Sequence, residues 1–170
     1  MKVALIVAMD LDRGIGKNND LMWNLPVDMR FFKDTTAGQI VIMGRKNYDS
    51  IPEKYRPLPG RENVILTRNT EFSAEGCAVF HSLTEALENY KNEEERTVFI
   101  IGGGEIYRQA MEEEMVDVMY ISHINHSYGA DTFFPKFELG DWIVESILTQ
   151  GVDERHSASF LTMKYTKAFR

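Results

Sequence analysis

The sequence predicts an α/β fold, with a central twisted and mainly parallel sheet of about eight strands, about four flanking helices and an antiparallel C-terminal hairpin. Three observations predict it. The middle strand candidates are nearly continuously apolar, as strands covered on both faces should be. Helical segments alternate with these strands. The last two strand candidates have no helix between them, which favours an antiparallel pair across residues 150–157.

The expected strands are residues 2–9, 40–43, 63–67, 78–81, 97–101, 117–124, 142–149 and 158–166. The expected helices are residues 26–36, 45–51, 83–91 and 105–113. Pro26 suits the first turn of the first helix, because a missing N–H group costs little there. The third helix follows the spacing of a capping box, in which the side chains of Ser82 and Glu85 satisfy exposed backbone donors.

The composition is that of an ordinary globular protein: of 170 residues, 44% are hydrophobic and 26% are charged. No repeat or long linker divides the chain, so we expect a single domain over residues 1–170. The net charge of -7 argues against a general nucleic-acid surface. No apolar run approaches the roughly 18 residues of a membrane span, and residues 3–9 lack a cleavage site. We therefore expect a cytoplasmic protein without a membrane partner.

Cysteine and histidine give no sign of a reactive thiol or a metal site. Cys77 is the only cysteine, so no intrachain disulfide is possible, which agrees with a reducing compartment. We assign Cys77 to packing or to a loop. His123 and His126 are three residues apart, and such residues point to opposite faces of a strand. We therefore expect no bound metal.

Three glycines follow the strand at residues 97–101 and precede a predicted helix. Gly102, Gly103 and Gly104 allow the backbone to approach a phosphate closely, and a helix N-terminus presents free N–H groups to it. The pattern is neither the G-x-G-x-x-G of a typical dinucleotide-binding fold nor a Walker loop. It indicates either a cradle for a diphosphate or a tight turn between strand and helix.

Cations also follow predicted strands, at the edge where open sheets bind their ligands. Arg45 and Lys46 come directly after Gly44, and Arg68 follows the strand that ends at Thr67. Cations at a helix N-terminus oppose the helix dipole, so an anionic group opposite them would explain their position. The alternative is that each is an isolated, solvated side chain, but their shared position favours a local anion site.

Asp28 lies in an apolar and aromatic stretch, residues 23–32, and falls one helical turn before Phe32 on the same face. Such a carboxylate is either a buried functional group or a simple complement to the positive helix N-terminus, worth about 0.3 to 1 kcal/mol. The proline-rich turn at residues 56–61 also has two interpretations. It either holds Arg61 to clamp a carboxylate or is a rigid surface connection.

Taken in order, these segments resemble the dihydrofolate reductase family in its bacterial, single-domain form, from one end of the chain to the other. The matching blocks are Asp12-Arg13-Gly14-Ile15-Gly16, Trp23-Asn24-Leu25-Pro26 with Asp28, Met43-Gly44-Arg45-Lys46, Ser50-Ile51, Arg56-Pro57-Leu58-Pro59-Gly60-Arg61, Ile101-Gly102-Gly103-Gly104 with Ile106-Tyr107, and Asp131-Thr132 with Phe134-Pro135.

The resemblance implies NADPH-dependent reduction of 7,8-dihydrofolate to tetrahydrofolate, in support of one-carbon and thymidylate metabolism, and binding of antifolate inhibitors. Hydride would pass from nicotinamide C4 to pterin C6, and water would supply the proton to N5. The implied catalytic residues are Asp28, Trp23 and Leu21. Asp28 would pair with the pterin's 2-amino group and N3 through charge-assisted hydrogen bonds, and Ser122 would share that contact through water.

The resemblance also implies two sets of binding residues. The substrate would contact Ile6, Val7, Ala8, Asp28, Met29, Phe32, Ile51, Leu58, Arg61, Ile101, Tyr107 and Ser122. The cofactor would contact Ala8, Ile15, Gly16, Gly44, Arg45, Lys46, Asn47, Thr67, Arg68, Ile101, Gly102, Gly103, Gly104, Glu105, Ile106 and Tyr107. Arg61 would bind the glutamate carboxylate of folate. The three cations at the strand ends would meet the 2'-phosphate that distinguishes NADPH from NADH, and a cis peptide would join Gly102 to Gly103.

The chain departs from the commonest family pattern at Met22, Asn47, Glu105, Ser122 and Ala130. None of these removes a group that the chemistry needs, because asparagine and serine still donate and accept hydrogen bonds. Two other functions are possible: an NADPH-dependent reductase of the same fold in flavin synthesis, or a phosphate-binding module without redox chemistry. Neither has the same need for Asp28. We expect a monomer, since no long exposed apolar stripe calls for a partner.

Overall fold

The computed structural model describes residues 1–168. Its helices are α1 (Pro26–Thr36), α2 (Arg45–Ser50), α3 (Leu83–Asn89) and α4 (Gly104–Glu112), with short 3-10 helices η1 (Glu53–Tyr55) and η2 (Leu139–Asp141). Its strands are β1 (Lys2–Met9), β2 (Gly14–Gly16), β3 (Ile40–Gly44), β4 (Glu62–Leu66), β5 (Cys77–Phe80), β6 (Thr97–Ile100), β7 (Val118–Ile124), β8 (Thr132–Phe133), β9 (Trp142–Gln150) and β10 (Phe160–Lys167).

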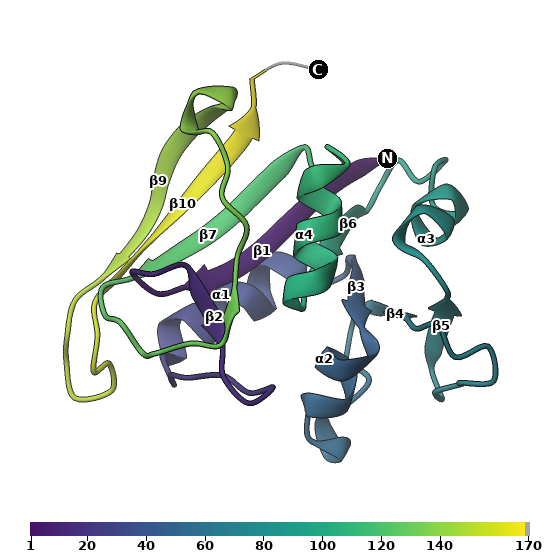
Figure 1. The fold of residues 1–170 in the computed structure, drawn as a ribbon, viewed down its shortest axis with the longest axis horizontal. Helices are drawn as coiled ribbons and strands as arrows, with labels where there is room; N and C mark the ends of the chain where they lie inside the picture. Colours follow the sequence, from purple (N-terminus) through teal and green to yellow (C-terminus); the bar gives the residue numbers. More distant parts are fainter. Residues whose placement is uncertain (169–170) are drawn as a thin grey trace.

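Eight of the strands form one twisted sheet in the order β5-β4-β3-β6-β1-β7-β10-β9 (Figure 1). Every pair from β5 to β7 is parallel. β10 runs antiparallel to both β7 and β9, and β9 and β10 form the predicted hairpin at one edge of the sheet. Because the parallel strands share one direction, their carboxyl ends lie along one edge of the sheet, where the loops that follow them meet.

The predicted fold class is confirmed, and α1 begins and ends at the predicted residues. The other predicted helices and strands differ from those observed by at most two residues at either end. β2 and β8 were not predicted, and they pair with each other in a separate two-stranded sheet. Segments of three and two residues are too short to show an alternating pattern.

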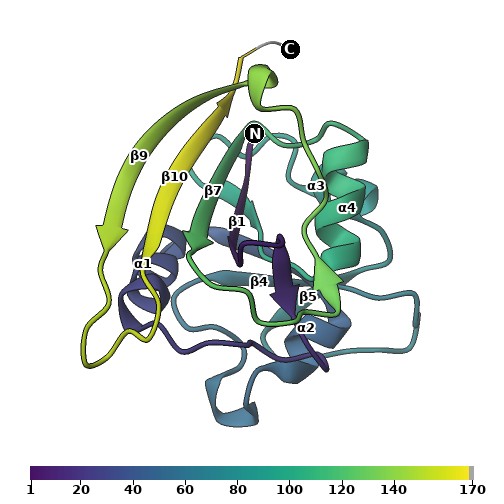
Figure 2. The same ribbon diagram turned by 60° about the vertical axis from the view of Figure 1, so that its left-hand side comes forward.

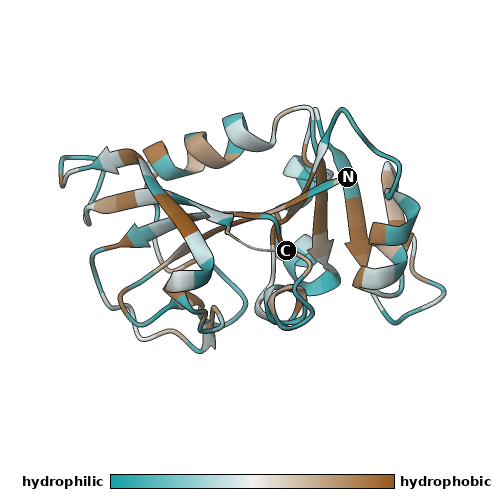
Figure 3. Ribbon diagram, turned by 90° about the horizontal axis from the view of Figure 1, so that it is seen from above, coloured by the Kyte–Doolittle hydropathy of each residue, from teal (hydrophilic) through white to brown (hydrophobic). Residues whose placement is uncertain are grey.

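Alternate side chains of β1 point into two different cores, one on each face of the sheet. Leu5 packs in the cluster that contains Tyr107 of α4. Ile6, the next residue, packs in a second cluster, against which Phe32 of α1 lies. Seen from above, helices lie on both sides of the sheet (Figure 3). This burial on both faces accounts for the continuously apolar central strands.

A buried carboxylate, that of Asp10, joins two loops at the end of β1. Its Oδ1 accepts hydrogen bonds from the backbone N–H groups of Asp12 (2.8 Å) and Gly14 (2.7 Å). Its Oδ2 accepts another from the N–H group of Tyr128, at 3.0 Å, in the loop after β7. The segment before β2 is therefore fixed to the segment before β8, and both strands are held at the carboxyl edge of the main sheet.

The serine half of the predicted capping box of α3 is present and gives a test of local stability. Ser82 Oγ accepts a hydrogen bond from the Glu85 N–H group at 3.0 Å. We expect Ser82→Ala to lower the free energy of unfolding by about 1 kcal/mol, because an orphan backbone donor loses its partner. Urea unfolding followed by circular dichroism measures this change. Ser73→Ala, at an exposed serine outside any helix, is the control, and an equal loss in both variants would contradict the assignment.

Candidate active site

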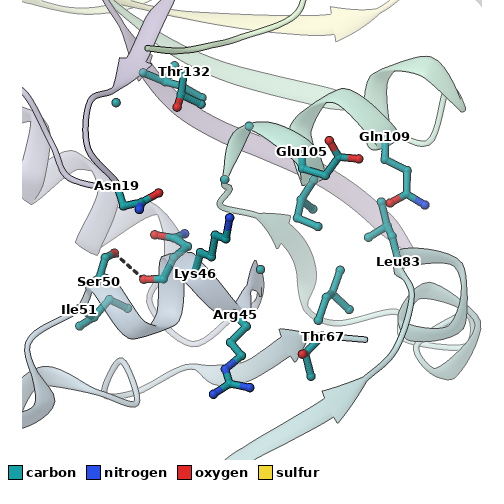
Figure 4. A pocket seen from close by; sticks show the side chains of 18 of the residues that line it. Asn19, Arg45, Lys46, Ser50, Ile51, Thr67, Leu83, Glu105, Gln109 and Thr132 are labelled. Atoms are coloured by element: carbon teal, nitrogen blue, oxygen red, sulfur yellow. Dashed lines mark hydrogen bonds between the residues drawn. The ribbon is translucent and has the colours of Figure 1, made fainter. Parts of the chain in front are cut away.

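A cavity of about 1060 Å³ lies at the carboxyl edge of the parallel strands (Figure 4). Its walls come from the segments that follow β1, β3, β4, β5, β6 and β7. Predicted cofactor residues that line it are Ile15, Gly16, Gly44, Arg45, Lys46, Asn47, Thr67, Arg68, Gly103, Gly104, Glu105 and Ile106. Leu21 and Ile51, predicted for catalysis and for substrate binding, line it as well. The structure thus brings residues from six separate parts of the chain to one cavity.

The cations predicted at the strand ends all line this cavity. Arg45 and Lys46 leave the start of α2 in different directions (Figure 4). The Arg45 guanidinium lies 4.2 Å from the centre of the Phe72 ring and 3.4 Å from an Asp49 carboxylate oxygen, so it is held in place. Arg68 and Lys46 are exposed. These cations give the cavity a positive side in a chain whose net charge is -7.

The glycine turn leads directly into α4 and leaves the helix start open. The N-cap residue, Gly103, makes no side-chain capping hydrogen bond. A Cβ atom on Gly104 would lie 2.7 Å from Thr132 Cγ2, so a larger residue does not fit there. The peptide between Gly102 and Gly103 is cis, as the resemblance implies. Exposed N–H groups at a helix N-terminus, with no side chains in front of them, fit a diphosphate.

Two predicted cofactor residues have specific partners beside this turn. The Asn47 side-chain amide donates to the Ile101 carbonyl at 3.1 Å, so it joins the start of α2 to the end of β6. Glu105 is exposed and pairs with Arg108 one turn further along α4. The Glu105 carboxylate adds negative charge to the cavity, and Arg108 offsets it.

Asp28 is linked to the sheet by a chain of hydroxyl groups. Ser122 Oγ donates to Asp28 Oδ1 at 2.6 Å, and Ser122 Oγ lies 2.7 Å from Thr162 Oγ1. Burial raises the pKa of the Asp28 carboxyl, and the hydrogen bond from Ser122 partly opposes that effect. Burial is the largest effect on the pKa of Asp28, so this carboxyl is not simply a surface complement to the helix dipole. The geometry favours the functional interpretation.

Predicted substrate residues surround one apolar face on the α1 side of the sheet. Phe32, Ile51, Leu58 and Ile101 all pack against the core cluster that contains Ile6. These side chains come from α1, from the end of α2, from the proline-rich turn and from the end of β6. Met29 is 56% exposed, one residue after Asp28 on α1. A flat aromatic ring that reached Asp28 would lie beside this apolar surface.

Both arginines of the proline-rich turn are held by hydrogen bonds. Arg61 Nε donates to the Pro59 carbonyl at 3.0 Å, and its terminal nitrogen donates to Thr36 Oγ1 at 3.1 Å. Burial lowers the pKa of the Arg61 guanidinium from its high ordinary value. Arg56 instead donates to the carbonyls of Tyr48, Asp49 and Ile51. Arg56 therefore caps the end of α2, while Arg61 lies near the end of α1.

Four predicted cofactor residues are not part of the cavity wall. Ala8, Ile101, Gly102 and Tyr107 do not line the cavity. Tyr107 is buried, and its hydroxyl donates to the Ile6 carbonyl at 2.8 Å. Val7, also predicted for the substrate, is buried in the core cluster on the other face of the sheet. A carbonyl oxygen has two lone pairs, so the Ile6 carbonyl keeps one acceptor site for another donor.

The loop before α1 contains the other predicted catalytic residues. Leu21 is 63% exposed, whereas the Trp23 ring lies 5.3 Å from the ring of Tyr128, measured between centroids. The Asn18 N–H group donates to Asp131 Oδ2 at 2.9 Å. This loop is therefore held from the β7–β8 side while its Leu21 remains at the cavity.

Some residues of the cavity were not predicted from the sequence. The additional lining residues are Asn19, Asp20, Ser50, Pro52, Leu66, His81, Ser82, Leu83, Gln109 and Thr132. His81 directly follows β5, as Arg68 follows the end of β4, so the same reasoning about strand ends would have found it. Gln109 lies one turn into α4, where position alone gives no signal.

Within residues 1–168, no cluster of three or more histidine, cysteine or acidic side chains could hold a metal ion. No helix in the same range is long and apolar enough to cross a membrane.

These features define an α/β enzyme that binds a phosphorylated nucleotide at the carboxyl edge of a parallel sheet, with a half-buried carboxylate and an apolar face on the α1 side. The comparisons with known proteins agree with this class. The family model for dihydrofolate reductase matches residues 2–167, so the chain belongs to the dihydrofolate reductase family.

Individual relatives give the same result. The chain is 43% identical to dihydrofolate reductase from Staphylococcus haemolyticus over 156 residues, which cover 92% of this chain and 90% of that protein. It is 36% identical to the Bacillus subtilis enzyme over 165 residues, covering 97% and 94%. A solved structure, dihydrofolate reductase from Enterococcus faecalis complexed with NADP(H) and RAB-propyl, is 32% identical, with a TM-score of 0.87 and coverage of 99% and 97%.

The raised pKa of Asp28 leads to a prediction about stability and pH. Below the ordinary aspartate pKa of about 3.9, the carboxyl is protonated in both folded and unfolded states. As the pH rises through the raised folded pKa, ionisation of the buried group lowers the stability of the folded chain. We expect Asp28→Asn, without ligand, to have a higher free energy of unfolding than the wild type at pH 7. This difference in the free energy of unfolding should disappear at about pH 3.5 and below, where the carboxyl is protonated in both states.

Urea unfolding at several pH values measures this difference. Asp34→Asn changes an exposed acid on the same helix and should show no such gain. A wild type as stable as Asp28→Asn at pH 7 would contradict the proposed effect of burial.

Proposed function

We propose that the chain reduces 7,8-dihydrofolate to 5,6,7,8-tetrahydrofolate with NADPH, and that Asp28 is the residue that binds and polarises the pterin. The observation that carries this proposal is the half-buried Asp28 carboxylate, held by Ser122 at 2.6 Å beside an apolar face. The family membership and the NADP(H) bound to the Enterococcus faecalis relative support it. A phosphate-binding module without redox chemistry would have no use for such a carboxylate.

Asp28 acts by position and charge. Its Oδ1 already accepts from Ser122, and the carboxylate retains acceptor sites for the 2-amino group and N3 of a pterin. Two charge-assisted hydrogen bonds in a water-poor site orient the ring, and the negative charge of the carboxylate stabilises the positive charge that the ring gains when N5 is protonated. Asp28 lies at the far side of the pterin from N5 in this binding mode, so it does not deliver the proton itself. Water that enters beside Leu21 supplies that proton.

The cofactor, when bound, supplies the hydride that reduces the C6 atom of the pterin. The chain's own contribution is to hold and orient it. The open backbone at Gly103 and Gly104 receives the diphosphate, and Ile15 provides an apolar wall beside it, 3.7 Å from where a Cβ atom on Gly104 would lie. Arg45, Lys46 and Arg68 receive the 2'-phosphate at the positive side of the cavity.

The apolar face holds the rest of the substrate. Phe32, Ile51 and Leu58 pack the aminobenzoyl part, and Arg61 binds the glutamate carboxylate in bidentate fashion. Thr36 and Pro59 already hold the Arg61 guanidinium, which reduces the entropy lost when it binds. Antifolates that carry an aminopyrimidine occupy the Asp28 end of the same site. We further propose that the enzyme acts in the cytoplasm as a monomer.

The activity is tested by the loss of NADPH absorbance when dihydrofolate is added. We expect the wild type to turn over and Asp28→Asn to lose about a hundredfold or more in kcat/KM at neutral pH, since the neutral amide polarises the pterin less. Asp34→Asn on the same helix is the control and should retain activity. An inert wild type would exclude the proposed reaction, and a fully active Asp28→Asn variant would exclude the proposed role of Asp28.

The cations of the cavity are tested by comparing the two nicotinamide cofactors. We expect Arg45→Gln and Arg68→Gln each to raise the KM for NADPH about tenfold, because each loses a charged contact with the 2'-phosphate. The KM for NADH, which lacks that phosphate, should change little. Lys54→Gln removes an exposed cation that contacts Tyr55 outside the cavity and should change neither value. Equal effects on NADPH and NADH would contradict the assignment of the phosphate site.

A further inference from the structure

A buried histidine in the loop between β9 and β10 contacts the start of α1. His156 is 2% exposed, although its neighbours Arg155 and Ser157 are exposed. The two strands bring this loop to the end of the molecule where α1 begins (Figure 2). A buried imidazole between exposed neighbours needs polar partners. Both ring nitrogens of His156 have one.

The first partner is the helix itself. The Val27 backbone N–H group lies 3.1 Å from His156 Nε2. An amide N–H group can only donate, so Nε2 is the acceptor and carries no proton. The other nitrogen, Nδ1, lies 3.0 Å from Asp153 Oδ1 and donates its proton to that carboxylate. Asp153 therefore fixes the tautomer in which His156 can accept from the helix.

This contact replaces a cap that α1 does not have in its own sequence. The N-cap residue, Leu25, has no side chain that can accept a hydrogen bond, and Pro26 has no N–H group. Val27 is thus the first residue of α1 with an orphan backbone donor. A side chain 129 positions away in sequence satisfies it.

Apolar packing supports the same arrangement. Leu25 is completely buried in a cluster with Ala158 and Phe160, which follow His156 in the chain. Trp23 and Val27 pack against this cluster. The β9–β10 loop therefore packs against the segment that leads into α1, and the hydrogen bond from Val27 to His156 fixes the position of the first turn of the helix.

We propose that His156 is a positioning residue for dihydrofolate binding, because it fixes the first turn of α1 and so the place of Asp28. Asp28 directly follows Val27, and its side chain is held by Ser122 on β7. His156 holds the backbone of this turn, and Ser122 holds the carboxylate. The inference rests on the proposed role of Asp28 as the pterin ligand. It assigns to the β9–β10 loop a part in substrate binding without contact with the substrate.

The test compares variants that keep or remove the acceptor. His156→Phe keeps an aromatic ring beside Phe160 but has no acceptor, whereas His156→Gln can place its amide oxygen near the position of Nε2. We expect the Phe variant to raise the KM for dihydrofolate about three- to tenfold, as expected for one lost hydrogen bond. The KM for NADPH should stay within about twofold. The Gln variant should restore the KM for dihydrofolate to within about twofold of the wild type.

Two further variants keep the inference testable if the Phe variant does not fold. Asp153→Ala changes an exposed position and removes the carboxylate that fixes the tautomer, so it should raise the KM for dihydrofolate about twofold or more. Glu154→Ala, at the exposed neighbouring acid, is the control and should leave both KM values unchanged.

The outcomes separate this inference from the proposed function. An unchanged KM for dihydrofolate in folded His156→Phe, or in Asp153→Ala where the Phe variant does not fold, would overturn the inference. Equal rises in both KM values, or a Gln variant as impaired as the Phe variant, would overturn it too, since they indicate general packing. Asp28→Asn is assayed alongside. If that variant is inactive while His156→Phe behaves like the wild type, only the role of His156 fails.

Discussion

The common direction of the six strands from β5 to β7 is the constraint on which the rest of the structure depends. Parallel neighbours cannot be joined by tight turns, so the chain returns over the faces of the sheet and begins each strand at the same edge. Every strand then ends at the opposite edge. The cations after β3 and β4, the glycine turn after β6 and the loop after β1 meet there although they are far apart in sequence. One geometric rule thus assembles the cavity.

The two ends of the site differ in charge and in the way that charge is held. At one end, Arg45 and Lys46 leave a short helix and stand partly in solvent. At the other end, Asp28 is surrounded mainly by protein and is linked through Ser122 to Thr162 on β10. A mobile anionic group can be received by solvated cations, but a planar ring that must be aligned for reaction needs a fixed partner. The different burial of the two ends suits the different tasks that we propose for them.

Most of the sheet and all four α-helices could be predicted from sequence, because their signals are local. The apolar run of β3 and the proline at the start of α1 are each visible within a few residues. The interactions that hold the loops were not visible in this way. The Asp10 carboxylate accepts a hydrogen bond from a backbone N–H group of another loop, and His156 accepts one from α1, which is far away in sequence. Such pairs depend on the tertiary fold, and nothing in either segment alone specifies the partner.

The residues of the cavity likewise differ in how well the sequence predicts them. Residues directly after a strand, such as Arg45 and Gly103, follow from topology. The position of Gln109 in the cavity wall depends on the rotation of α4 about its axis, which the sequence does not specify. Tyr107 is buried in the core, and its hydroxyl donates to the Ile6 carbonyl. The resemblance to the family supplied the roles that geometry alone left open, above all for Arg61, which could otherwise be a structural arginine.

The close approach at Gly14 limits how this sequence can evolve. A Cβ atom there would lie 2.4 Å from the Cβ atom of Ala130 and within 2.9 Å of both carboxylate oxygens of Asp10. Replacing Ala130 by glycine would remove only the first of these obstacles. Position 14 therefore has no room for a side chain, whichever small residue occupies position 130. We expect natural variants to explore position 130 while position 14 stays glycine for as long as Asp10 is retained.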